Sequence, residues 1–211
     1  MKRTRILFII GVLALFLSGC VVYSFYPLYT EKDLFENDIL LGDWFEDDDQ
    51  DVFFDEGDDE WKFEHSFIGN KEDSIRDKKS YLLTLTSKEN ELEKESMFKV
   101  HIIQLAGQYF LDFYIEDYGG EDEISLATLH LVPVHTFAKL TIYDDRLEIK
   151  WFDPGWLENL IKENKIRIHH ENNGDYILLT AKPGELQKFV TKYVNSEEAY
   201  KDGLEVVLHR K

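Results

Sequence analysis

Acidic side chains are concentrated in one stretch of this 211-residue chain, where they could bind a metal ion. Residues 43–60 hold eleven acids and no base. Oxygen ligands of this kind suit Ca²⁺, and four aspartates have a suitable spacing: Asp47, Asp49, Asp51 and Asp55. The stretch departs from an EF-hand, because Val52 stands where that loop needs glycine and Asp58 where it needs glutamate. A looser Ca²⁺ site and a solvated acidic loop are the two interpretations.

A second carboxylate that could do chemistry is Asp112, which lies between Phe110 and Tyr114. A carboxylate buried on an aromatic strand face must be paired, hydrated or raised in pKa, so Asp112 could line a cavity. The alternation of its neighbours favours solvent exposure instead, because the side chains expected to face the core are Tyr109, Leu111 and Phe113.

The histidines show no spacing typical of a metal site. His169 and His170 are adjacent, so on a strand they point to opposite faces. Four more are scattered and are interpreted as hydrogen-bonded surface or core residues: His65, His101, His130 and His135. The sequence also lacks a serine-hydrolase elbow, a phosphate-binding loop, a dinucleotide-binding motif and a zinc-protease motif. It therefore predicts a protein that is not an enzyme and needs no cofactor.

Cys20 is the only cysteine, and the residues before it form an export signal. Three basic residues precede an apolar run over 6–17, which is too short to span a bilayer comfortably. Leu17-Ser18-Gly19-Cys20 follows directly and resembles the lipobox of bacterial lipoproteins. That resemblance implies cleavage before Cys20 and a diacylglycerol on its thiol. The alternatives are an ordinary secretory signal or an N-terminal membrane helix, with Cys20 incidental.

Composition excludes several classes of protein. A single cysteine cannot form an intramolecular disulfide or a multi-cysteine zinc site. With 42 acidic and 24 basic residues, the net charge of −18 argues against nucleic-acid binding, which needs a basic surface. Without residues 1–19 the charge becomes −21, and sixteen of these negative charges lie in 43–60 and 116–123. The rest of the body is nearly balanced in charge.

Alternation of apolar and polar side chains predicts a mainly β body. Five clear strands are expected at 80–87, 97–105, 109–115, 136–143 and 146–152. Shorter candidates lie at 41–45, 60–65, 176–180 and 204–209. Four triplets are each expected to share one strand face: Tyr81, Leu83 and Leu85; Phe98, Val100 and Ile102; Ala138, Leu140 and Ile142; Leu147, Ile149 and Trp151. Short turns between the strands, such as Ala106-Gly107-Gln108, indicate an antiparallel β-barrel or sandwich.

Two or three short helices are expected in the C-terminal half. Asp153 is a typical N-cap and Pro154 a typical first-turn residue. A second helix is predicted over 183–193, because its apolar residues recur at helical spacing: Leu186, Phe189, Val190 and Tyr193. A third helical turn follows Ser196. These apolar stripes are interpreted as packing surfaces.

Gly42-Asp43-Trp44 resembles the Gly-x-Trp signature at the start of the first lipocalin strand. In lipocalins this tryptophan plugs one end of an eight-stranded barrel and a cation stacks on it, a role that Arg210 could fill here. The chain departs from lipocalins by placing two helices ahead of its last strand and by lacking their second signature. Further segments resemble a group of uncharacterised bacterial lipoproteins, which implies no activity: Tyr26-Pro27-Leu28-Tyr29, Leu40-Leu41-Gly42-x-Trp44 and Phe152-Asp153-Pro154-Gly155-Trp156-Leu157.

Three parts are expected along the chain: a removed signal peptide (1–19), a lipid-anchored N-terminal segment (20–38) and one β-rich, lipocalin-like domain (39–211). The uncharged, aromatic residues 21–30 predict that the anchor segment packs on the domain. Candidate pocket or core residues are Trp44, Phe98, Phe110, Asp112 and Trp151. Whether the interior is hollow stays open, because aromatic side chains that line a pocket alternate in the same way as those that fill a core.

The function expected from these features is that of a non-enzymatic lipoprotein of the bacterial cell envelope. The lipid would hold it at a membrane, either on the periplasmic side or at the cell surface, and the barrel would bind a small apolar ligand or act as an accessory module. The alternative is a structural or interaction protein whose acidic loops meet another envelope protein. An envelope hydrolase also stays open, since catalytic groups can converge from distant strands.

Overall fold

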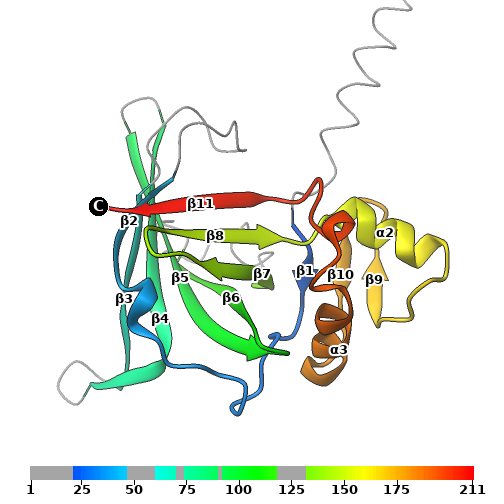
Figure 1. The fold of residues 1–211 in the computed structure, drawn as a ribbon, viewed down its shortest axis with the longest axis horizontal. Helices are drawn as coiled ribbons and strands as arrows, with labels where there is room; N and C mark the ends of the chain where they lie inside the picture. The colour runs from blue at the N-terminus through cyan, green and yellow to red at the C-terminus, as the bar shows by residue number, and fades with distance from the viewer. Residues whose placement is uncertain (1–20, 47–59, 70–73, 90–91, 118–131) are drawn as a thin grey trace, which may run out of the picture.

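Eight antiparallel strands close into a barrel, as predicted (Figure 1). The computed structural model describes residues 21–46, 60–69, 74–89, 92–117 and 132–211. The barrel strands are β2 (Gly42–Glu46), β3 (Glu60–Ile68), β4 (Ile75–Glu89), β5 (Leu92–Leu105), β6 (Gln108–Asp117), β7 (His135–Ile142), β8 (Arg146–Trp151) and β11 (Glu205–Arg210). Each strand from β3 to β8 pairs with the strand before it along the chain, and β11 lies between β2 and β8. The pairing of β6 with β7 closes the ring.

The barrel interior is filled by apolar side chains. All four predicted triplets belong to this cluster, so the predicted strand faces are confirmed. Trp44 and Trp151 are buried in it, and Phe98 packs against it. The buried members of the cluster are at most 8 % exposed, which leaves the described interior occupied by side chains rather than open to a ligand.

A second apolar cluster covers part of the outer wall. It is formed by outward-facing barrel residues such as Phe110 and by side chains of four elements at one end of the barrel (Figure 1). These elements are α2 (Pro154–Lys162), β10 (Ile177–Leu179), α3 (Pro183–Tyr193) and the 3-10 turn η3 (Glu197–Ala199), and the short strand β9 (His170–Asn172) pairs with β10 beside them. Asp153 caps α2 as predicted, because its Oδ1 accepts a hydrogen bond from the Gly155 N–H at 2.7 Å. Among the described residues, no helix is long and apolar enough to cross a membrane.

The N-terminal segment 21–41, here called the strap, packs along the barrel as predicted. Its strand β1 (Tyr23–Ser24) pairs with β7 and with β10, and Val22 and Leu28 are buried in the second cluster. Further along, the Phe35 N–H donates to the Ile102 carbonyl at 2.9 Å, beyond the point where β4 stops pairing with β5. The strap ends in the 3-10 turn η1 (Asp38–Leu40), whose Leu40 is buried in the barrel cluster.

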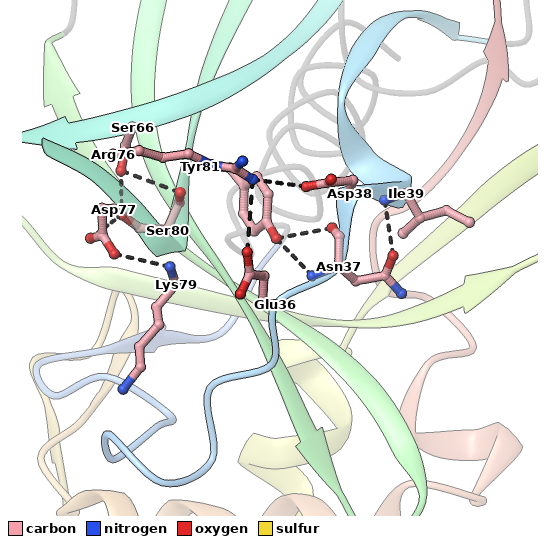
Figure 2. A network of polar contacts seen from close by, with 10 residues as sticks. All are labelled: Glu36, Asn37, Asp38, Ile39, Ser66, Arg76, Asp77, Lys79, Ser80 and Tyr81. Carbon is pink, nitrogen blue, oxygen red and sulfur yellow. Dashed lines mark hydrogen bonds and ion pairs between the residues drawn. The ribbon is translucent and has the colours of Figure 1, made fainter.

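Polar contacts hold the end of the strap against β4 (Figure 2). The Tyr81 hydroxyl accepts a hydrogen bond from the Asn37 N–H and donates one to the Asn37 carbonyl, both at 2.9 Å. Arg76 Nη2 lies 3.0 Å from Asp38 Oδ1 and 3.9 Å from Glu36 Oε1. The strap is therefore fixed to the barrel at its start, its middle and its end.

Trp44 and Arg210 make the contact that the lipocalin resemblance implies. The Arg210 guanidinium lies 4.6 Å from the centre of the Trp44 ring, and its Nη2 donates to the Ile39 carbonyl at 2.9 Å. The indole N–H of Trp44 donates to the Leu40 carbonyl at 2.7 Å. The turn at the end of the strap is thus held between the first and last strands of the barrel.

Candidate functional site

A row of polar side chains crosses the outer wall of the barrel on three neighbouring strands. His101 on β5 lies directly opposite Asp112 on β6, and His135 on β7 lies opposite Tyr114, two residues further along β6. Because side chains alternate along a strand, these residues face outward while Leu111 and Phe113 face the barrel interior. The prediction that Asp112 faces solvent is wrong: it is 0 % exposed, because the strap covers this part of the outer wall.

Asp112 is bound on both of its carboxylate oxygens. Oδ2 accepts a hydrogen bond from the Leu28 N–H of the strap at 2.8 Å, and Oδ1 lies 2.7 Å from His135 Nδ1. Burial raises the pKa of Asp112, whereas His135 and the Leu28 N–H act in the opposite direction. Since Nδ1 is occupied, His135 can offer only Nε2 to a ligand. A buried carboxylate thus orients an imidazole ring.

A cleft of about 510 Å³, here called the outer groove, lies over this polar row. Five of its lining side chains carry rings: Phe25, Tyr29, His101, Tyr114 and His135. Val132 and Pro133 add apolar surface. The groove also contains an ion pair, in which Lys99 Nζ lies 3.0 Å from Glu116 Oε1. The volume and the mixture of rings with a few polar groups are typical of sites for small molecules.

The rings of the groove contact one another in two pairs, with interplanar angles of 35° and 37°. Tyr29 of the strap lies over His101 at 4.3 Å between ring centres, and Tyr114 lies over His135 at 4.7 Å. Burial and the nearby Asp112 raise the pKa of Tyr29 to about 12, so its hydroxyl keeps its proton and can donate a hydrogen bond. Burial and the Lys99 ammonium lower the pKa of His101 to about 4, so its ring is neutral near pH 7.

The depressed pKa of His101 makes a testable contribution to acid sensitivity. The folded protein takes up this proton only near pH 4, whereas an unfolded histidine takes it up near pH 6.5. The contribution of neutral His101 to the free energy of unfolding is therefore fully present above pH 6.5. About 3 kcal/mol of it is lost as the pH falls from 6.5 toward 4. Urea unfolding at pH 7 and pH 4.5 should show a smaller acid loss in His101→Phe than in the wild type. Equal losses in both proteins would contradict the assignment.

A second cleft, of about 540 Å³, lies where β7, β8 and β11 meet the end of α3. Three of its charged groups contact one another: Lys150 Nζ lies 3.0 Å from Glu205 Oε1 and also pairs with Glu148. Lys139 Nζ donates to the Val194 carbonyl at 3.3 Å. Only two of its lining side chains are aromatic, Tyr143 and Tyr200, so the outer groove is the better candidate site for a ligand with an apolar part.

The structure separates the site residues that the sequence analysis grouped as pocket or core. Trp44, Phe98 and Trp151 belong to the barrel interior, Phe110 belongs to the second cluster, and only Asp112 lies beside the outer groove. Cys20 and the Ca²⁺ candidates Asp47, Asp49, Asp51 and Asp55 lie outside the described residues. The sequence analysis did not predict that Tyr29, His101 and His135 line one groove. One signal for the Asp112–His135 pair was available, because these residues lie on strands predicted to be consecutive and antiparallel neighbours usually follow one another along the chain.

The described residues include no group of three or more histidine, cysteine, aspartate or glutamate side chains that could hold a metal ion. Comparisons with protein-family models, with curated proteins and with solved structures found no match to this chain.

Proposed function

We propose that this protein is a lipid-anchored lipoprotein of the bacterial cell envelope that binds a small amphipathic molecule in the outer groove. The observation that carries the proposal is the placement of the buried Asp112–His135 pair beside a ring-lined cleft of about 510 Å³. A buried carboxylate that holds an imidazole beside a cleft is typical of functional sites, which favours a binding role for this part of the barrel wall. The proposed ligand site therefore lies on the outer wall of the barrel and not in the barrel interior, which apolar side chains fill.

The anchor part of the proposal rests on the signal sequence and on Cys20. Replacing Cys20 by alanine removes the thiol that would carry the lipid, so the variant is expected to leave the membrane fraction and become soluble. Cell fractionation followed by immunoblotting measures this. A Cys20→Ala protein that stays in the membrane fraction would contradict lipid anchoring.

The chemistry of the groove indicates what kind of ligand fits. Its ring faces and apolar surface suit an acyl chain or a planar apolar group. The Tyr29 hydroxyl can donate a hydrogen bond, and His135 Nε2 can accept or donate one according to its protonation. An amphipathic molecule with an apolar body and a hydrogen-bonding polar group matches both sets of side chains.

The binding proposal is tested by what co-purifies with the protein. Native mass spectrometry of protein extracted from membranes should detect a retained small molecule, and Tyr114→Ala should lose it because a groove wall is removed. Tyr143→Ala is the matched control, since Tyr143 lines the second cleft. Loss of the molecule in Tyr143→Ala alone would move the site to that cleft, and a wild type without any retained molecule would contradict the proposal.

A second candidate function is hydrolysis, which the Asp112–His135 pair specifically favours. A carboxylate that holds Nδ1 leaves Nε2 to accept a proton from water that attacks a bound ester. Chromogenic esters, phosphoesters and glycosides offer a direct test: activity present in the wild type should be lost in His135→Gln and kept in His169→Gln. Equal activity in the wild type and His135→Gln would reject this candidate.

The interaction alternative rests on the acidic loops. Most of residues 43–60 and 116–123 lie outside the described residues, so the contacts given above do not bear on it. Cross-linking in cells, with capture that weakens as salt rises, remains its test.

A further inference from the structure

Apolar side chains are exposed together on the face of the protein that carries β1. Phe25 is 48 %, Tyr176 49 % and Val132 65 % exposed. Tyr23 joins them into one surface, since its ring contacts that of Tyr176 at 5.9 Å and Phe25 lies two residues further along the strap. Phe25 and Val132 both line the outer groove. These four residues are called the β1 patch.

The chain leaves little freedom between Cys20 and this patch. Val22 is 3 % and Ser24 0 % exposed, and β1 is paired on both sides, so the strap is fixed to the body two residues after Cys20. Four residues separate Cys20 from Phe25, and the five steps between these two residues span at most about 18 Å in a fully extended chain. A lipid on Cys20 would therefore hold the β1 patch beside the bilayer, without a tether that lets the body turn away.

We propose that the β1 patch rests on the surface of the membrane in which Cys20 is anchored, with Phe25 and Tyr176 at the level of the lipid headgroups. The inference depends on the lipid anchor of the proposed function. Tyrosine favours this interfacial region, where its apolar ring and its polar hydroxyl are both accommodated, and the apolar ring of Phe25 gains by leaving water there. Because Phe25 and Val132 also line the outer groove, the groove opens at the interface and takes its amphipathic ligand from the bilayer.

The protein contains its own controls. Three apolar residues that are more exposed than Phe25 and Tyr176 lie on the hairpin of β3 and β4, where Phe67, Ile68 and Ile75 are 62 %, 63 % and 74 % exposed. Figure 1 places this hairpin across the barrel from β1. If exposed apolar surface were enough for membrane contact, both the β1 patch and the hairpin would contact the bilayer. If the anchor fixes the orientation of the protein, only the β1 patch contacts it.

The test uses the lipidated, full-length protein in phosphatidylcholine vesicles. Cys20 is the only cysteine, so once its sulfur carries the diacylglycerol a cysteine introduced at Phe25, Tyr176, Phe67 or Ile75 is the only free thiol for an environment-sensitive fluorophore. Labels at Phe25→Cys and Tyr176→Cys should shift to shorter emission wavelengths and lose fluorescence to a quencher carried on lipids. Labels at Phe67→Cys and Ile75→Cys should behave as in water.

Two other outcomes have separate meanings. Equal quenching at the patch and the hairpin, or stronger quenching at the hairpin, would overturn the proposed orientation while leaving the anchor intact. Protein that does not float with the vesicles would overturn the lipid anchor itself, and with it the inference. Thermal unfolding curves that match the wild type establish that each labelled variant is folded.

Discussion

Asp112→Ala is expected to lower the free energy of unfolding by about 3–5 kcal/mol, because removing one partner of a buried pair leaves the remaining polar groups buried without a hydrogen-bond partner. The substitution takes away the acceptor of the Leu28 N–H and the partner of His135 Nδ1 in one step. It also leaves a space in a region that is 0 % exposed. Urea unfolding at pH 7, in the Cys20→Ala background to avoid detergent, measures the change.

Two further variants separate this effect from a general loss of charge. Asp112→Asn keeps a side-chain oxygen for the Leu28 N–H, so it should be destabilised less than Asp112→Ala. Asp145→Ala removes an exposed carboxylate in the turn between β7 and β8 and should change the free energy by no more than about 0.5 kcal/mol. Equal losses in Asp112→Ala and Asp145→Ala would contradict the role given to Asp112.

Gly203→Ala is expected to destabilise the protein by about 3 kcal/mol or more, since overpacking of a closed site forces the backbone apart. A β-carbon at this position would lie 2.3 Å from the Trp151 carbonyl oxygen and 3.0 Å from the Asp153 nitrogen. The approach is close because the Trp151 N–H donates to the Leu204 carbonyl at 2.8 Å. The alanine would therefore disturb the junction of β8, α2 and β11.

Gly184→Ala is the matched control for Gly203→Ala. Gly184 lies in the first turn of α3, and nothing would lie within 4 Å of an added β-carbon. Alanine also restricts the unfolded chain, so this variant should gain about 0.4–1 kcal/mol. The two variants should move the urea midpoint in opposite directions, and a shared direction would contradict the packing described at Gly203.

Much of the fold could be predicted from the sequence because barrel strands and helices carry local signals. Alternation identified which residues of β4, β5, β7 and β8 face the interior, and Asp153 with Pro154 identified the start of α2. The two residues of β1 have no such pattern, since they are held by their neighbours β7 and β10. Short elements of this kind depend on tertiary contacts that local sequence does not encode.

The candidate site could not be predicted in the same way. Alternation placed Asp112 on the outward face correctly, but an outward face is solvated only if nothing covers it, and here the strap does. The pairing of Asp112 with His135 depends on the register between β6 and β7, which are joined through residues outside the described ranges. The contact of Tyr29 with His101 joins positions 72 residues apart along the chain.

The position of β11 between β2 and β8 has a consequence for the order of folding. All the other barrel strands precede β11 along the chain, so a polypeptide made from its N-terminus can form only an open sheet until Glu205–Arg210 is available. During that interval β2 and β8 present free edges, which are templates for pairing with another chain. Barrel closure is thus a late, long-range step, and the growing chain is most prone to aggregate just before it.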